Sequence, residues 1–403
     1  MANVLFSSAY GARQTTLAWV ALETTGSAVA VGWVVAAQLL PFIVLGLSAG
    51  VVVDRRSRRR TILAVEVATT LVTLAFGLVT LAGLEVWQIF AFAAGLGVIS
   101  LLDNPVRGAM VWEVVGTRHM ANAVRVNGIT YQTGQILGPM AAGFLIAAVG
   151  PGATLLLVAV VGTAEFLTMR AIRVRETVVR QTALRASVPR RRGELRELAA
   201  YVRRKPRIVT VLLLVGVVST LITTMPVLLS SYSSEVFGTG SSGFGVFTAV
   251  VAVGALCGAL LSVVAPFPTV VSAIATATAL AAVQATTAWL PTPVAFAAGL
   301  AGLGTLLMLT DIGNLSIVQV SSPARIKGRI LALQSVLYLG GQGIGGLLMG
   351  VAVSALGPRV SMSASGVATL LLVLAIALVA GRRARATAPA HRPRPSAPRS
   401  VTP

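Results

Sequence analysis

The sequence has little charge, few aromatic side chains and almost no cysteine or histidine. Charged residues make up 11% of its 403 residues, whereas hydrophobic residues make up 56%, with a mean hydropathy of +0.86. A soluble protein has about a quarter of its residues charged, because water must solvate its surface. The scarcity of charge therefore excludes an ordinary soluble globular protein.

The scarcity of reactive side chains excludes most site chemistries. One cysteine, Cys257, can form neither an internal disulfide nor a cysteine-based metal cluster. The two histidines, His119 and His391, stand in no metal-ligand spacing and no catalytic pattern, so we expect no enzyme activity, no metal site and no cofactor. The phosphate-binding pattern G-x-x-x-x-G-K-[ST] is also absent, which excludes direct use of ATP by this chain.

Long apolar runs are what the sequence has instead. A helix that crosses a bilayer needs about 20 mostly apolar residues, and such runs recur along the whole chain. They predict an all-α integral membrane protein with twelve spanning helices. Because the first run has no cleavage-like end, we expect no removable signal peptide. The runs lie at 3–23, 30–53, 61–82, 86–103, 122–148, 152–172, 207–231, 243–264, 269–290, 293–318, 330–353 and 358–380.

The positive charge lies on one side of the predicted membrane. The chain has 32 Lys and Arg against 12 Asp and Glu, a net charge of +20. All Lys and Arg except Arg13 and Arg359 fall in alternate loops, the adjacent helix ends or the tail. Cytoplasmic loops are enriched in these residues, so we expect both termini in the cytoplasm of a multi-pass plasma-membrane protein. A nucleic-acid surface would interleave arginines with aromatic residues, and we expect no nucleic-acid partner.

A basic stretch at 173–206 divides the twelve helices into six and six. It separates an N-terminal bundle at 1–172 from a C-terminal bundle at 207–380. Apolar residues at helical spacing within this linker predict either a short helix lying on the inner membrane surface or a solvated linker helix. The Pro- and Arg-rich tail at 381–403 is predicted to be a disordered cytoplasmic segment.

The two halves also share a short repeat. The segment YQTGQILGP at 131–139 aligns with YLGGQGIGG at 338–346, at an offset of 207 residues. Parallel repeats related by an axis along the membrane normal are typical of one large class of transporters. The repeat therefore favours a transporter built from two pseudo-symmetric bundles.

Twelve helices, a basic central loop and a motif after the helix at 30–53 together resemble the major facilitator superfamily of transporters. The motif has the form G-x-x-x-D-R-x-x-R-R, with Ser57 where a glycine is usual. Its residues are Gly50, Asp54, Arg55, Arg58 and Arg59. The resemblance implies two six-helix bundles that rock about a central site.

A second signature of the superfamily, G-x-x-x-G-P-x-x-x-G, lies in the predicted helix at 122–148. Its residues are Gly134, Gly138, Pro139 and Gly143. In the superfamily this pattern marks exporters that work as antiporters. The stretch DNPVRGAMVWEVVGTRHMANAVRVN is similar to the drug:proton antiporter branch that contains macrolide-efflux proteins and the enterobactin exporter.

The resemblance gives Asp54 the role of a latch between the halves. In the superfamily the helix at 30–53 packs against the helix at 330–353. This places Asp54 near the start of the latter helix, around Gly328–Arg329. A carboxylate at a helix N-terminus is favoured by about 0.3–1 kcal/mol. We expect this contact to hold the outward-facing state and to break when the inner side opens.

The arginines beside Asp54 have two interpretations. The resemblance implies that Arg55 and Arg58 bind Asp103 or Glu113 near the end of the helix at 86–103. The alternative is that the arginines only keep their loop on the cytoplasmic side. This is our interpretation of Arg56 and Arg60, which lie outside the motif.

Four pairs of glycines at a spacing of four residues predict close helix packing. Small residues at this spacing let helix backbones approach in lipid, and in the superfamily the helices that carry them form the interface between the halves. Any single pair is also explained by the abundance of glycine, 40 in all. The pairs are Gly46 and Gly50, Gly134 and Gly138, Gly254 and Gly258, and Gly341 and Gly345.

Ionisable residues inside predicted spans are costly and usually functional. Arg13 lies within a helix that lines the central cavity in the superfamily. It is expected to bind an anionic part of the substrate or to neutralise a buried acid, unless it extends to the inner surface. Asp311 is the candidate proton site, because a carboxylate in a low-dielectric site can load and release a proton; a structural role is the alternative. For Glu66 and Glu165, on peripheral helices, we expect a structural or interfacial role.

The remaining polar residues suit an amphiphilic substrate. A mostly apolar pocket with scattered hydrogen-bonding groups fits such a compound, and Tyr131, Gln135, Tyr338 and Gln342 are the candidate substrate or proton residues. Further polar residues of the cavity are Gln14, Thr15, Asn127, Gln132, Asn314 and Gln334.

The sequence thus predicts a secondary active transporter. We expect proton-coupled efflux of an amphiphilic small molecule of the drug, antibiotic or siderophore type, by alternating access and as a monomer in the lipid bilayer. An importer or uniporter of a small metabolite with the same fold is the alternative. A channel would not explain the repeat and the motif after the helix at 30–53 together.

Overall fold

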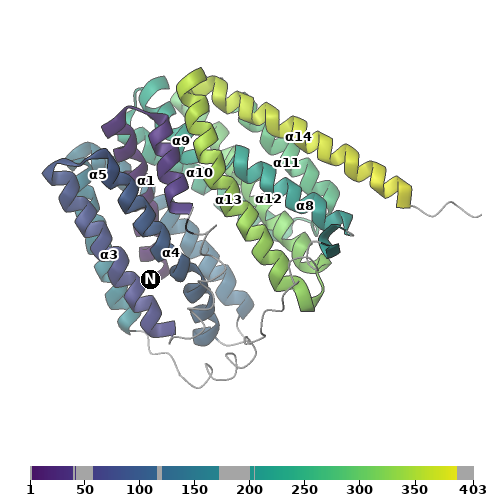
Figure 1. Cartoon of the computed structure of the whole chain (residues 1–403), viewed down its shortest axis with the longest axis horizontal. Helices are drawn as coiled ribbons and strands as arrows, with labels where there is room; N and C mark the ends of the chain where they lie inside the picture. Colours follow the sequence, from purple (N-terminus) through teal and green to yellow (C-terminus); the bar gives the residue numbers. More distant parts are fainter. Residues whose placement is uncertain are drawn as a thin grey trace, which may run out of the picture.

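The computed structural model describes residues 2–39, 41, 58–115, 120–171, 200–203 and 205–387 of the chain. Every regular element in these ranges is a helix, as Figure 1 shows. This agrees with the predicted all-α class.

The N-terminal half begins with α1 (Ala2–Thr25) and the helix Ala28–Leu39, which are followed by α3 (Arg58–Gly83), α4 (Val86–Val115) and α5 (Met120–Ala171). The backbone of α5 leaves helical geometry at Gly150, where φ is +81°. A positive φ is accessible to glycine because it has no Cβ, and the proline that follows can begin a new helix. The chain therefore reverses at Gly150, and α5 consists of two helices, as the sequence predicted.

The C-terminal half contains a longer series of helices. They are α8 (Pro206–Leu221), α9 (Met225–Ser231), the π-helical turn η2 (Tyr232–Val236), α10 (Gly240–Val264), α11 (Val270–Thr287), α12 (Pro293–Ser321), α13 (Ala324–Leu356) and α14 (Pro358–Thr387). The single predicted run at 207–231 is thus broken between α8 and α9, just before Pro226, because proline removes a backbone donor from a helix interior.

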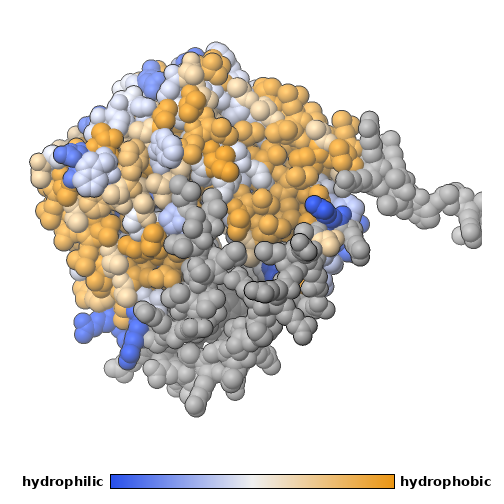
Figure 2. Space-filling model, in the orientation of Figure 1, coloured by the Kyte–Doolittle hydropathy of each residue, from blue (hydrophilic) through white to orange (hydrophobic). Residues whose placement is uncertain are grey.

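The outer surface of the helices is apolar, as a bilayer requires. Nine helical stretches among the described residues are long and apolar enough to cross a membrane, and one of them, 126–171, contains the reversal at Gly150. Large hydrophobic side chains such as Leu71, Val160 and Leu371 are exposed. Figure 2 shows hydrophobic residues spread over the face in view. Apolar surface of this extent belongs in lipid, so the chain is an integral membrane protein.

Two boundaries differ from the sequence prediction. The helix α4 continues beyond residue 103 to Val115, where a loop was expected from 104. The helix α14 continues to Thr387, so the first residues of the predicted disordered tail are helical, because Ala and Arg are good helix formers. The rest of the tail, most of the linker at 173–206 and residues 42–57 lie outside the described residues. The twelve predicted runs each overlap a helix, and the count of twelve spans stays a prediction.

The two halves touch through glycines. A Cβ placed on Gly143 of α5 would lie 2.8 Å from the Cα atom of Gly245 in α10. A Cβ on Gly32, in the helix Ala28–Leu39, would overlap the carbonyl oxygen of Gly346 in α13. At both places one backbone lies directly on the other, which only glycine allows.

These contacts lie towards one end of the bundle. The chain turns at this end at Gly26, Gly150 and Gly357, and we call it the Gly150 end; we call the opposite end, where α1 starts, the N-terminal end. Trp19 of α1 also stacks on Phe244 of α10 in the half of the bundle nearer the Gly150 end, with 6.1 Å between the ring centroids. The described contacts between the halves thus hold the Gly150 end together.

The predicted repeat extends to its packing. The hydroxyl of Ser7 donates a hydrogen bond to the carbonyl of Thr130 (3.4 Å), and the hydroxyl of Ser219 donates one to the carbonyl of Leu337 (3.1 Å). Thr130 and Leu337 are separated by the same 207 residues as the two copies of the repeat. In both halves, therefore, a serine of the first helix binds the same position of the repeated helix.

The glycine pairs pack within the halves rather than between them. A Cβ on Gly138 would overlap the backbone of Ser8 in α1, and a Cβ on Gly345 would overlap the backbone of Thr220 in α8. Gly254 in α10 lies in the same way against Ala301 in α12. The helices that carry the pairs do meet across the halves, α5 with α10 and the helix Ala28–Leu39 with α13, but the described paired glycines themselves lie against helices of their own half. Glycine spacing indicates that a backbone approaches but not which one. Gly46 and Gly50 lie outside the described residues.

Candidate functional site

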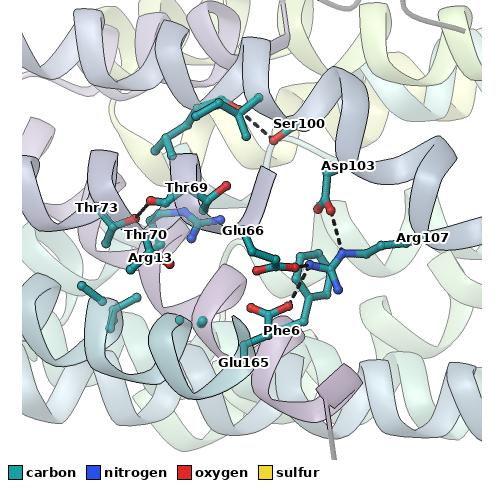
Figure 3. Close-up of a pocket in the computed structure, with 16 residues that line it drawn as sticks. Phe6, Arg13, Glu66, Thr69, Thr70, Thr73, Ser100, Asp103, Arg107 and Glu165 are labelled. Atoms are coloured by element: carbon teal, nitrogen blue, oxygen red, sulfur yellow. Dashed lines mark hydrogen bonds and ion pairs between the residues drawn. The ribbon is translucent and has the colours of Figure 1, made fainter. Parts of the chain in front are cut away.

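A buried cluster of charges lies inside the N-terminal half, centred on Arg107 of α4. The Nε atom of Arg107 donates a hydrogen bond to Oδ1 of Asp103, one turn earlier in the same helix, at 2.7 Å. Its Nη2 atom donates to Oε1 of Glu165 in α5 at 2.7 Å and also to Oε1 of Glu66 in α3. Figure 3 shows the three carboxylates directed towards this one guanidinium. Three helices are thus joined through a single side chain.

The face of the Arg107 guanidinium is covered by an aromatic ring of α1. The Cζ atom lies 3.4 Å from the centroid of the Phe6 ring, a distance at which the ring's negative face attracts a cation. Glu66 and Glu165 are almost fully buried, with 3% and 4% of their side-chain surface exposed. The charges are therefore shielded from water and interact with one another strongly.

A second guanidinium lies in the same region. Arg13 of α1 is 8% exposed and lines the same cavity as Glu66 and Glu165. Among the residues that the structure describes, none forms an ion pair or a hydrogen bond with the Arg13 side chain; its Cζ atom lies 5.8 Å from the centroid of the Tyr10 ring. The expected role for Arg13 of neutralising a buried acid fits this position better than exposure at the membrane surface does.

The cavity between these residues is small and polar. Its volume is about 20 Å³, and a cavity needs roughly 10–15 Å³ to hold one water molecule. Hydroxyl-bearing residues line it beside the charges, and Figure 3 shows them near Arg13: Thr69, Thr70 and Thr73. In this conformation the site has room for water and protons but not for an organic substrate.

A different polar group lies in the C-terminal half. The hydroxyl of Tyr338 in α13 donates a hydrogen bond to Oδ2 of Asp311 in α12, at 3.4 Å. Gln342 follows Tyr338 one turn further along the same helix. In the other copy of the repeat, Nε2 of Gln135 donates to the hydroxyl of Tyr131 at 2.9 Å. The repeat therefore includes the same tyrosine–glutamine pair in both halves.

The helix α1 carries a third pair of this kind. Nε2 of Gln14 donates a hydrogen bond to the hydroxyl of Tyr10 at 3.2 Å. Gly11, next to Tyr10 in α1, lies against Gln135 and Pro139 of α5, so the pair on α1 is close to the pair on α5. Of the four predicted substrate or proton residues, Tyr131 and Gln135 thus lie together in α5, and Tyr338, one turn before Gln342, lies beside Asp311.

The motif after the helix at 30–53 is largely outside the described residues. This applies to Asp54 and Arg55, and of Arg58 only the backbone is described, as also for Glu113 in α4. Arg59 donates a hydrogen bond to the carbonyl of Arg170 at 3.0 Å. The latch therefore stays a prediction, although Asp103, one of its expected acids, binds Arg107 in this structure.

The residues of the second signature let α5 pack closely against two neighbouring helices. A Cβ on Gly11 of α1 would lie 2.8 Å from Cδ of Pro139, and Gly134 and Gly138 lie against Ser7 and Ser8 of the same helix. Gly143 contacts α10 instead. The signature therefore brings α5 close to α1 within its half and to α10 across the two halves.

Sequence reasoning missed the cluster around Arg107. It placed Arg107 in a loop, and it treated Glu66 and Glu165 as peripheral. Two signals were available: Asp103 and Arg107 are four residues apart, the spacing of a helical ion pair, and a buried acid requires a partner. The nearest partner of Glu66 is 41 residues away in the sequence, and spacing within one helix does not reveal such a contact.

Comparison with known proteins identifies the class. A family model described as transmembrane secretion effector matches residues 1–399. An uncharacterized MFS-type transporter, YfiS of Bacillus subtilis (strain 168), is 30% identical over 109 residues. The matched segment is 27% of this chain and 25% of the relative. The chain therefore spans about a quarter of the length of the curated relative that it matches.

Solved transporter structures share the fold over nearly the whole chain. A mutant of the nucleoside transporter NupG superposes with a TM-score of 0.74 at 12% identity, covering 94% of this chain and 97% of that one. A bacterial homologue of the human lysosomal transporter Spinster, in an inward-facing and unoccupied conformation, gives 0.72 at 15% identity, covering 94% and 96%. A D-xylose–proton symporter gives 0.71 at 14% identity, covering 93% and 95%. At these identities the similarity shows the fold alone.

Proposed function

Since the chain belongs to the transmembrane secretion effector family of the major facilitator superfamily, we propose that it exports an amphiphilic small molecule in exchange for protons. In this proposal twelve helices cross the plasma membrane, both termini lie in the cytoplasm, and a monomer works by alternating access in the lipid bilayer. The substrate is of the drug, antibiotic or siderophore type.

The observation that carries the proposal is the contact between the halves. Gly143 against Gly245, and Gly32 against Gly346, are backbone contacts without side chains that interlock. Such a contact is held by van der Waals packing, and it can open as a unit when the halves rotate. Because the described contacts lie towards the Gly150 end, we assign this structure to an inward-facing state, with the Gly150 end outside.

The export direction and the proton are supported by separate residues. The signature at Gly134, Gly138, Pro139 and Gly143 resembles that of antiporters in the superfamily. Asp311 is an acid with a tyrosine hydroxyl as its hydrogen-bond partner, which suits a site that exchanges a proton. The tyrosine–glutamine pairs nearby offer hydroxyl and amide groups to a substrate that is otherwise apolar.

The latch completes the proposed cycle. Asp54 binds the start of α13 near Gly328 in the outward-facing state and releases it when the N-terminal end opens. Arg55 and Arg58 then stabilise the released loop by binding one of two acids of α4. Asp103 is one of them and already binds a guanidinium in the present structure, and Glu113 is the other.

Uptake is the second candidate function. The printed names of two similar structures are those of a nucleoside transporter and a D-xylose–proton symporter. An importer or uniporter of a small metabolite would use the same fold, so the direction of transport must be measured.

The test measures accumulation of a broad panel of amphiphilic compounds in an efflux-deficient bacterium. The strains express the wild type, Asp311→Asn, Asp54→Asn or the control Glu85→Gln, whose carboxylate is exposed at the Gly150 end. We expect the wild type and Glu85→Gln to lower accumulation of at least one compound, and a protonophore and the other two variants to abolish the effect at equal expression. Raised accumulation in the wild type would show uptake and overturn the proposed direction.

A further inference from the structure

The cluster around Arg107 contains two carboxylates on one nitrogen atom. Oε1 of Glu66 and Oε1 of Glu165 both accept from Nη2 of Arg107. Because both oxygens bind this one nitrogen, the two carboxylates are immediate neighbours. Two like charges this close disfavour ionisation of both groups, so that one of the two carboxyl groups keeps a proton.

The charges that face this pair do not balance. Among the side chains that the structure describes, the charged ones from the packed helices are Arg13 on α1, Glu66 on α3, Asp103 and Arg107 on α4, and Glu165 on α5. If all were ionised, three carboxylates would face two guanidinium groups, leaving one negative charge in a buried site. An uncompensated buried charge is costly, and such a site takes up a proton instead. One proton on the carboxylate pair makes the cluster neutral.

We propose that Glu66 and Glu165 share one exchangeable proton and form a proton-binding site in the N-terminal half, separate from Asp311. Binding of the proton follows from the cluster itself. Its use to drive transport rests on the proposed function. The cavity beside the pair has room for about one water molecule in its 20 Å³, and such a molecule can accept the proton.

Arg13 connects this site to the centre of the molecule. It is more than nine-tenths buried, lines the cavity, and has no ion-pair partner among the described residues. When the O–H bond of the shared carboxyl group breaks, the proton passes to water and the pair gains one negative charge. Arg13 is the guanidinium available to compensate it. Because Tyr10 lies under Arg13 and binds Gln14, a movement of Arg13 towards the pair changes the part of α1 that packs against Gln135 and Pro139 of α5 at Gly11.

Infrared spectroscopy of the purified full-length protein in lipid nanodiscs tests the proton directly. The C=O stretching band of protonated carboxylic acids is followed as the pH is raised, in the wild type, Glu66→Gln, Glu165→Gln, Asp311→Asn and the control Glu85→Gln. Replacing either glutamate leaves two carboxylates for two guanidinium groups, so the remaining glutamate is ionised. We therefore expect each of the two single variants to lose the band area of one protonated carboxylic acid, and Asp311→Asn to retain it.

Arg13→Gln is expected to preserve the C=O band rather than to remove it, and this variant leaves all three carboxyl groups in place. The variant leaves three carboxylates facing one guanidinium, so we expect the band to persist to higher pH by at least one unit. Loss of the band in only one glutamate variant, no loss in either, or an unchanged pH midpoint in Arg13→Gln would each overturn the proposal.

The readout separates this site from the proposed function. A carboxyl band that depends on both glutamates, in a protein that exports nothing, would keep the proton site and reject the exporter. Protonophore-sensitive export that survives in Glu66→Gln and Glu165→Gln, without any loss of the band, would keep the exporter and reject this proton site.

Discussion

Gly143 and Gly245 lie backbone to backbone across the two halves of the molecule. A Cβ atom placed on either residue would lie 2.8 Å from the Cα atom of the other. Real Cβ atoms do not approach another carbon so closely, so neither position accepts a larger residue while the halves are in contact. The pair therefore reports on whether the Gly150 end is closed.

Gly143→Val should open the Gly150 end. Overpacking at a tight contact costs about 1–3 kcal/mol, and 1.4 kcal/mol changes an equilibrium tenfold, so we expect the closed population to fall about tenfold. Spin labels at Val149 and Ser234, in a Cys257→Ala background, measure the distance between the halves. The matched control is Gly128→Val in the same helix, since a Cβ there meets nothing within 4 Å. A closed distance distribution in Gly143→Val would contradict the prediction.

The equivalent glycines of the repeat should respond alike. Gly138→Ala and Gly345→Ala each place a methyl group against a backbone within their own half, and we expect each to lower the free energy of unfolding by about 1–3 kcal/mol. Thermal unfolding followed by tryptophan fluorescence measures the change. Gly216→Ala in α8 is the control, because a Cβ there meets nothing within 4 Å and alanine favours the helix. If the two repeat variants are as stable as this control, the close packing is wrong.

Removal of Arg107 should destabilise the N-terminal half more than removal of any one acid. Arg107→Gln leaves three carboxylates without their common partner, and breaking a buried ion pair costs about 3–5 kcal/mol. Arg107→Lys should restore only part of the loss, because an ammonium group lacks the planar fork that reaches several acceptors. Glu66→Gln combined with Arg107→Gln should recover part of the stability. Strictly additive effects in this double-mutant cycle would show that the two residues are not coupled.

Tyr338→Phe should shift the pH dependence of transport. The tyrosine hydroxyl donates to the Asp311 carboxylate, and a hydrogen bond of this kind favours the ionised form. Without it the carboxyl group keeps its proton to higher pH, so the limb of the pH–rate profile that belongs to Asp311 moves upward. Efflux from proteoliposomes at a series of pH values measures the shift. Tyr201→Phe, outside this site, should leave the profile unchanged, and a similar shift there would point to a general effect.

The orientation of the chain can be read by labelling two loops of the C-terminal half. In a Cys257→Ala background, Pro291→Cys lies at the Gly150 end and Ala265→Cys at the N-terminal end, and both positions are exposed. A membrane-impermeant maleimide added to intact cells should label only Pro291→Cys. Labelling of Ala265→Cys instead would place the termini outside the cell and reverse the proposed orientation.

The sequence by itself determined the class of the protein and the approximate places of its helices. A bilayer requires about 20 apolar residues in each spanning helix, and this requirement is local, so apolar runs mark helices without knowledge of the fold. The repeat at Tyr131 and Tyr338 is also a local pattern of residues, so it was visible without knowledge of the fold. The ends of the helices were not determined in this way: α4 passes through Pro105 to Val115, and Arg107 on this part of the helix binds acids of α3 and α5.

Only the tertiary structure decided which surfaces meet. The spacing of Gly138 and Gly345 predicted close packing, yet their partners are helices of their own halves. Glu66 and Glu165 looked peripheral along the chain, and they meet at Arg107 because α3, α4 and the second helix of α5 pack together. Contacts between residues far apart in sequence depend on the rotation and depth of each helix, and these are set by the packing of all the helices at once.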